Sequence, residues 1–142
     1  CKQGRHAHYN VFISMKKMSE GDPGRAGAAA LTFDHTKNVF VFDVDIDVFN
    51  PTDILWAIAT RVQPHKQISI LQPLFRGNFL DPSLLDEIKT SGMIVDATKP
   101  LDRPFSPVSK CPDEAMARIK LEEYVPGEVL QHIPMDRTTY WA

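Results

Sequence analysis

Three carboxylates stand at alternate positions directly after an apolar run, at Asp43, Asp45 and Asp47 in the segment FDVDIDVFN. Carboxylates with this spacing bind calcium in an EF-hand loop, which also needs a glycine at its sixth position and a glutamate at its twelfth. Val48 and Ile54 occupy those two places here. The sequence therefore excludes an EF-hand, and the three acids need another explanation.

Two other hypotheses remain for these acids. An apolar strand that ends in Asp-x-Asp resembles the nucleophile motif of haloacid-dehalogenase-type phosphatases, in which the first aspartate attacks phosphorus. Those enzymes carry a mobile cap and a lysine further along, whereas Asn50-Pro51 starts a helix at once and leaves no room for a cap insertion. The structural hypothesis is that the acids close a strand, cap the next helix and pair with lysine or arginine side chains.

Lys37 is the best candidate ligand on the evidence of the residues alone. It follows Thr36 and precedes the apolar run VFVF at residues 39–42, which predicts a loop just before a buried strand. An ammonium beside a hydroxyl can present charge to a phosphate in such a loop. A plain surface lysine is the alternative.

Two histidines offer a weaker case for a metal site. His6 and His8 share one face of the segment HAHYNVFISMKK if that segment is a strand, so together they could chelate a metal ion. The sequence supplies no evident third ligand. An exposed strand face explains the pair equally well, and no metal ligand is assigned.

Residues 72–83 (QPLFRGNFLDPS) are predicted to form a loop after the third strand. Pro73, Leu74 and Phe75 give this loop an apolar character. Apolar side chains at the carboxyl end of a strand can line a pocket for a flat apolar ligand. The same composition would also suit a dimer interface, and the two possibilities stay open.

The chain is predicted to run strand, helix, strand, helix, strand. Asn50 and Pro51 are an N-cap and first turn, as Asp22-Pro23 are for the earlier helix. The predicted bounds are a strand within residues 6–17, helices over 23–33 and 51–63, and strands over 39–42 and 67–71. The small residues AGAAAL in the first helix allow close approach to a neighbouring strand. This order favours an α/β fold: a small parallel or mixed sheet with flanking helices.

The last third of the chain differs in composition. Of the 11 prolines, six lie at or after Pro100, which predicts an extended arm interrupted by a helix over about residues 112–124. Such an arm needs a surface to lie on. We therefore expect an α/β domain over residues 1–105 and a Pro-rich interface segment over residues 106–142.

Overall composition narrows the class of protein. A chain of 142 residues fits one domain, and its net charge of −2 provides no basic surface for nucleic acid. No apolar run approaches the roughly 20 residues of a membrane-spanning helix. Cys1 and Cys111 show no metal or redox spacing. Because the first residue is cysteine rather than methionine, we expect a piece of a longer protein or a processed chain.

Three stretches together are similar to a known family. Residues 35–64 (HTKNVFVFDVDIDVFNPTDILWAIATRVQP), 80–83 (LDPS) and 95–100 (VDATKP) resemble the carboxy-terminal domain of the UbiD family. Those enzymes are reversible, non-oxidative decarboxylases of aromatic and unsaturated acids that use prenylated flavin mononucleotide (prenylated FMN). The resemblance runs from about Arg5 to Phe105, and its most specific part is Trp56-Ala57-x-x-Thr60-Arg61 together with the acidic strand end.

The resemblance implies a decarboxylation in which prenylated FMN is the electron sink and the protein supplies positioning and a proton. The family places its Arg-Glu-Glu catalytic set, and the ligands for a divalent metal (Mn or Mg) and potassium, in a domain upstream of this region. No residue of this chain is therefore assigned as catalytic, and we expect the chain to be inactive alone. The implied partner is that upstream domain or subunit, in a cytoplasmic enzyme.

The resemblance also gives roles to residues already noted. Lys37, with Thr36, looks like the group that reaches the cofactor phosphate, and Pro73-Leu74-Phe75 looks like the segment whose apolar side chains meet an aromatic acid. For the region as a whole, the resemblance implies a pocket wall and contacts in a homo-oligomer. A non-catalytic dimerisation module is the alternative function, and the phosphatase is a distant third.

Overall fold

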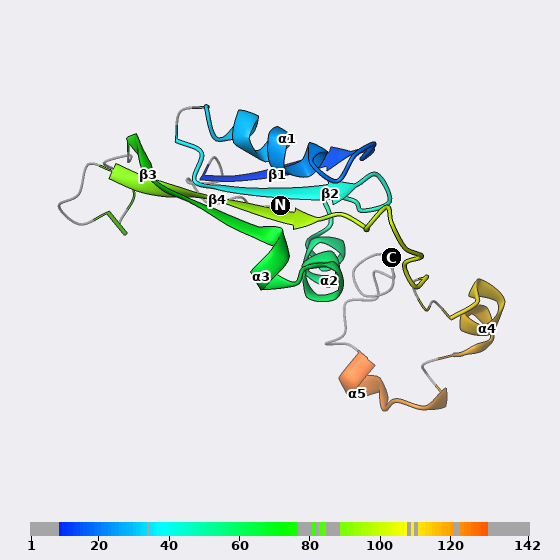
Figure 1. The fold of residues 1–142 in the computed structure, drawn as a ribbon. Helices are drawn as coiled ribbons and strands as arrows, with labels where there is room; N and C mark the ends of the chain where they lie inside the picture. The colour runs from blue at the N-terminus through cyan, green and yellow to red at the C-terminus, as the bar shows by residue number, and fades with distance from the viewer. Residues whose placement is uncertain are drawn as a thin grey trace. The chain divides into compact units, whose positions relative to one another are not determined.

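The structure is a computed structural model that describes residues 9–33, 35–76, 81, 83–84, 89–107, 109, 111–120 and 123–130. The chain divides into two compact units, Cys1–Pro104 and Phe105–Ala142. The first unit is a four-stranded sheet with helices against it (Figure 1). Its elements are β1 Asn10–Met15, α1 Asp22–Ala30, β2 Asn38–Asp43, α2 Pro51–Arg61, α3 Pro64–Gln67, β3 Ile68–Arg76 and β4 Lys89–Ala97.

The sheet is mixed, with strand order β1-β2-β4-β3. β1, β2 and β4 run parallel, with Met15 opposite Asp43 and Phe42 opposite Ala97 near their carboxyl ends. β3 is antiparallel to β4. The α/β fold with a small mixed sheet is confirmed. The third predicted strand, β3, lies at the edge of the sheet, because β4, which was not predicted, takes the place beside β2.

Helix α1 covers one face of the sheet at close range. Gly27 is buried there, and a Cβ added to it would lie 2.5 Å from Cγ2 of Ile94 on β4. The core on this face consists of Ala30, Leu31, Val39, Val41 and Ile94. The prediction that small residues let this helix approach a strand is confirmed.

The start of α1 differs from the prediction. Gly21 is the N-cap, and Asp22 is already helical. One Asp22 carboxylate oxygen instead accepts the backbone N–H groups of Met18 and Ser19, at 3.0 and 2.9 Å. The aspartate thus closes the preceding turn, a local bond that competes with the cap.

Helices α2 and α3 lie against the opposite face of the sheet (Figure 1). Asn50 caps α2 by accepting the Thr52 N–H at 3.0 Å, and Pro51 is the first helical residue, both as predicted. The core on this face consists of Phe42, Ile46, Ala57, Val62, Val95 and Ala97. This packing holds Arg61, the last residue of α2, close to the carboxyl end of β2.

The predicted loop at residues 72–83 is partly a strand. β3 continues through Arg76, with Phe75 opposite Thr90 and a register shift between Leu71 and Phe75. Pro73 is tolerated because β3 lies at the edge of the sheet and proline can occupy an edge strand or an irregularity in one. Residues 77–80 lie outside the described residues.

In the second unit, the described residues include the short helices α4 Asp113–Arg118 and α5 Gly127–Leu130. The helix predicted over residues 112–124 is therefore shorter than expected. Ile119, Tyr124 and Val129 are exposed in this unit. Within the part of the chain that the structure describes, no helix has the length and apolar character needed to cross a membrane.

Candidate functional site

Strand β2 has a polar cluster at each end. The carboxyl-end cluster comprises Asp43, Asp45, Arg61 and Lys99, and the amino-end cluster comprises Lys37, Asp81 and Ser83. The parallel register brings the ends of β1, β2 and β4 to the carboxyl edge together. Each cluster therefore joins segments that are distant in sequence.

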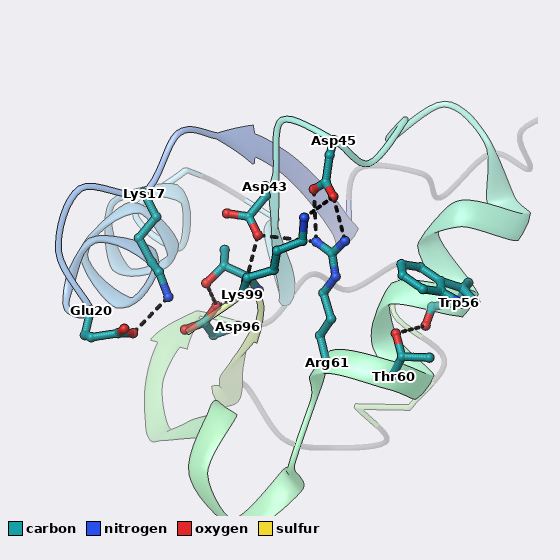
Figure 2. A network of polar contacts seen from close by, with 10 residues as sticks. Lys17, Glu20, Asp43, Asp45, Trp56, Thr60, Arg61, Asp96 and Lys99 are labelled. Atoms are coloured by element: carbon teal, nitrogen blue, oxygen red, sulfur yellow. Dashed lines mark hydrogen bonds and ion pairs between the residues drawn. The ribbon is translucent and has the colours of Figure 1, made fainter. Parts of the chain in front are cut away.

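Arg61 organises the carboxyl-end cluster (Figure 2). Its Nη1 and Nη2 donate to the two carboxylate oxygens of Asp45 at 3.1 and 2.8 Å, and Nη1 also lies 3.3 Å from Oδ2 of Asp43. The Arg61 side chain is fully buried. A buried guanidinium is costly without paired carboxylates, so the aspartates are what makes its position tolerable.

Lys99 completes the carboxyl-end cluster from the segment after β4. Its Nζ lies 2.6 Å from Oδ2 of Asp45, and its backbone N–H donates to Oδ2 of Asp43 at 2.7 Å. Burial acts to raise the pKa of Asp45, but the hydrogen bonds from Arg61 and Lys99 outweigh it and lower that pKa to about 2. Asp45 is ionised at neutral pH.

These contacts support the structural hypothesis for the acids. Asp43 and Asp45 pair with an arginine and a lysine, and Asp47 closes a turn by accepting the Phe49 N–H at 2.9 Å. Oδ2 of Asp43 is shared between Arg61 and the Lys99 backbone. The phosphatase alternative needs that carboxylate as a nucleophile, and this engagement argues against it.

Lys17 and Glu20 form a neighbouring ion pair that was not predicted. The Lys17 side chain is 2% exposed, and its ammonium lies 2.8 Å from Oε2 of Glu20. Oε1 of Glu20 accepts the Leu101 N–H at 2.6 Å. The hydrogen bond from Lys17, and then that from Leu101, lower the pKa of Glu20. The sequence showed Lys17 only as the end of an alternating strand, a position that says nothing of its burial.

The amino-end cluster is a closed ring of hydrogen bonds. Lys37 Nζ lies 2.8 Å from Oδ2 of Asp81 and donates to Ser83 Oγ at 2.6 Å. Ser83 donates to Oδ1 of Asp81 from its hydroxyl at 2.7 Å and from its backbone N–H at 2.9 Å. The Lys37 side chain is 29% exposed, and that of Asp81 is 9% exposed. Asp81 and Ser83, the partners of Lys37, were not predicted as site residues.

Thr36 and His35 lead into this cluster. Thr36 is buried, and its N–H donates to the Phe33 carbonyl at 3.2 Å. His35 has a φ of 71°, a left-handed conformation that is uncommon outside glycine. Among the residues that the structure describes, no hydrogen bond joins Thr36 to Lys37, Asp81 or Ser83. Of the two predicted phosphate ligands, Lys37 is the one in the amino-end cluster.

The other predicted site residues are not joined to Lys37 by any described contact. The backbone of Pro73, Leu74 and Phe75 lies in β3, and their side chains are outside what the structure describes. His6 and His8 are outside the described residues as well. Within the described ranges, no group of three or more His, Cys, Asp or Glu side chains could hold a metal ion.

Each cluster contains a partly exposed lysine that is paired with a carboxylate, Lys99 at 41% and Lys37 at 29% exposure. In the carboxyl-end cluster, Arg61 and Lys99 are both directed at carboxylates of the same cluster. Lys37 is partly exposed, and an ammonium has three hydrogens, of which Asp81 and Ser83 take two. Because Lys37 is also the predicted phosphate ligand, we take the amino-end cluster as the candidate binding site.

Comparison with known proteins assigns the family. Residues 2–97 match the 3-octaprenyl-4-hydroxybenzoate carboxy-lyase C-terminal domain (UbiD_C). The anhydromevalonate phosphate decarboxylase of Aeropyrum pernix is 46% identical over 94 residues, which are 66% of this chain and 21% of that protein. The chain thus spans about a fifth of that relative.

Solved structures agree with this assignment. The UbiD-class enzyme HmfF from Pelotomaculum thermopropionicum, in complex with FMN, superposes with a TM-score of 0.68 at 36% identity, over 83% of this chain and 26% of that one. An evolved dimeric form of it with prFMN gives 0.59 at 32% identity, over 83% and 23%. The closed form of Sedimentibacter hydroxybenzoicus vanillic acid decarboxylase gives 0.65 at 30% identity, over 81% and 26%. The chain belongs to the UbiD family of carboxy-lyases and comprises its C-terminal domain.

Proposed function

We propose that this chain completes a prenylated-FMN-dependent decarboxylase, as the carboxy-terminal domain or subunit that supplies a pocket wall and oligomer contacts. The observation that carries the proposal is the match to the UbiD_C family over residues 2–97. The catalytic arginine and two glutamates, with the divalent metal and potassium, belong to an upstream domain or subunit in this proposal. The chain is then inactive alone.

The relatives suggest two classes of substrate. The Aeropyrum protein decarboxylates a phosphorylated acid by its name and is 46% identical, whereas the vanillic acid decarboxylase is 30% identical. We therefore place a phosphorylated unsaturated acid first and an aromatic acid, as the sequence first suggested, second. Pro73, Leu74 and Phe75 would supply the apolar wall for either.

The chain's own contribution to cofactor binding is Lys37. Its ammonium is partly exposed and has the charge to bind one oxygen of a flavin phosphate. Thr36 is buried, which suits positioning the backbone before Lys37 better than touching the phosphate. When bound, prenylated FMN supplies the electron sink for cleavage of the carbon–carboxylate bond. In this proposal Lys37 orients that group.

Reconstitution tests the proposal. The 142-residue chain is mixed with the complementary upstream part of a UbiD relative and prenylated FMN, and carbon dioxide release is measured from a phosphorylated unsaturated acid and from vanillic acid. Release should require both parts. The chain carrying Asp47→Asn, a change at an exposed turn, is the matched control and should restore release equally. Absence of release in every pairing contradicts the proposal.

A dimerisation module is the second candidate function. The second unit exposes Ile119, Tyr124 and Val129, which are 47, 75 and 49% accessible. Large exposed apolar side chains often mark contacts between proteins. Sedimentation of the isolated chain decides this, since a monomer at high concentration removes the candidate.

A further inference from the structure

The Lys37 ammonium is already occupied by an anion of its own chain. The Asp81 carboxylate lies 2.8 Å from Nζ, and the two residues are 44 positions apart. A carboxylate at this distance makes the same charge-assisted hydrogen bond that a phosphate oxygen would make. The anion proposed to bind at Lys37 therefore meets a competitor.

The competitor is held in place by its own turn. Oδ1 of Asp81 accepts the backbone N–H of Ser83 at 2.9 Å and its hydroxyl at 2.7 Å, which leaves Oδ2 directed at Lys37. Hydrogen bonds from Lys37, and then from Ser83, lower the pKa of Asp81 to about 2. The carboxylate is thus charged and oriented before any ligand arrives.

A phosphate and Asp81 cannot both bind Lys37 without loss. If both groups bound the ammonium, the phosphate and the Asp81 carboxylate would be neighbours and would repel each other. Because Coulomb energy at a given dielectric depends only on charge and distance, this repulsion is of the same order as the attraction of either anion to the ammonium. A phosphate dianion carries more charge than a carboxylate and can displace one. A monocarboxylate or chloride gains nothing by the exchange.

We propose that Asp81, oriented by Ser83, is an internal competitor for the Lys37 ammonium, and that a phosphate monoester binds this chain by displacing the Asp81 carboxylate. The proposal rests on the role of Lys37 in the proposed function. It adds that Asp81 sets the affinity of the site and selects phosphate dianions over carboxylates. The monoester is that of a flavin mononucleotide or of a phosphorylated substrate.

Isothermal titration of the 142-residue chain tests this, with FMN, riboflavin, butyl phosphate and acetate as probes at one ionic strength. Asp81→Asn removes the charge but keeps an oxygen for the Ser83 N–H, and it should tighten phosphate binding about tenfold. Lys37→Met should remove the difference between FMN and riboflavin. Asp47→Asn is the control: Asp47 closes a similar turn at the other end of β2, and its replacement should leave phosphate affinity unchanged.

The competing sources of phosphate give different patterns. If Asp81→Asn tightens the binding of FMN alone, the site belongs to the cofactor. If it tightens the binding of butyl phosphate alone, the site belongs to a phosphorylated substrate. Either result supports the proposal that Asp81 competes for Lys37. Acetate should not bind the wild-type chain and should gain affinity in Asp81→Asn. Ser83→Ala frees the carboxylate in part and should tighten phosphate binding by about twofold to threefold.

Unchanged or weaker phosphate binding in Asp81→Asn overturns the proposal, including the case in which neither the wild type nor the variant binds. Circular dichroism verifies the fold, and if Asp81→Asn does not fold, Ser83→Ala decides by the same criterion. The reconstitution assay separates this failure from failure of the proposed function. If carbon dioxide is released in that assay but Asp81→Asn has no effect on phosphate binding, the role of Asp81 as a competitor is contradicted and the proposed function is not.

Discussion

Arg61 donates hydrogen bonds from both terminal nitrogens to the Asp45 carboxylate, and this ion pair connects the last residue of α2 to the turn that follows β2 (Figure 2). The Arg61 guanidinium also lies over the Trp56 ring, 5.2 Å from its centroid. Trp56 and Arg61 were the most specific part of the family resemblance. Their geometry shows that this signature stabilises the fold at the carboxyl edge of the sheet.

Replacement of Arg61 should destabilise the domain strongly. Arg61→Met leaves two carboxylates without their buried partner, and breaking such a pair typically costs about 3–5 kcal/mol. Asp45 is 39% exposed and water can compensate it, so we expect about 2–3 kcal/mol in urea denaturation. Arg25→Met, at an exposed position of α1, is the control and should change stability by less than about 0.5 kcal/mol. Equal stabilities for the two variants would contradict a structural role for the pair.

Gly27 should not tolerate a methyl group. In Gly27→Ala the new Cβ would lie 2.5 Å from Cγ2 of Ile94, so α1 must shift from the sheet at a cost of about 1–3 kcal/mol. Gly24→Ala lies in the same helix, where an added Cβ would have no atom of the described residues within 4 Å, and it should stabilise by up to about 1 kcal/mol. Urea denaturation compares the two variants. The opposite order of stability would show that the helix does not pack as closely as the structure indicates.

Local features of the fold were predictable because local chemistry determines them. Asn50-Pro51 begins α2 through a cap and a fixed φ, and the AGAAAL segment indicated close packing before its partner Ile94 was known. β4 was missed because its sequence KTSGMIVDA mixes Thr, Ser, Gly and Asp with apolar residues and has no simple period. Its identity as a strand depends on pairing with β2 and β3, which are distant in sequence.

The site was predictable only in part, for the same physical reason. The sequence indicated that the aspartates would pair with basic residues, but the identity of Arg61 and Lys99 required the α2 and β4 packing. Lys37 was found as a candidate because it precedes a buried strand. Its partners Asp81 and Ser83 lie 44 and 46 residues away on another segment, and no local pattern encodes that encounter.

The stability of the domain should fall at acid pH, where the carboxylates with a lowered pKa become protonated. For Asp45, burial acts to raise the pKa, but hydrogen bonds from Arg61 and Lys99 lower it to about 2. For Asp81, hydrogen bonds from Lys37 and Ser83 lower the pKa to about 2 as well, below the ordinary value of 3.8. Their contribution is complete above pH 4 and is lost as the pH falls toward 2. Asp45→Asn should therefore flatten the dependence of the urea midpoint on pH between 4 and 2. A slope identical to that of the wild type would contradict the ion pairs.

Glu20 should control the exchange of one backbone amide beyond β4. Glu20 accepts the Leu101 N–H at 2.6 Å with one oxygen and binds the buried Lys17 ammonium with the other, so it links the end of β1 to the segment after β4. Glu20→Ala removes the acceptor, and hydrogen exchange at the Leu101 amide should accelerate by about tenfold, the equivalent of one net hydrogen bond. Glu20→Gln keeps an oxygen for that amide and should preserve most of the protection. Exchange measured by NMR at Leu101, with the Val41 amide in the centre of β2 as an internal reference, distinguishes the variants. If Leu101 is equally protected in the wild type and in Glu20→Ala, while Val41 is unchanged, this carboxylate does not hold the segment.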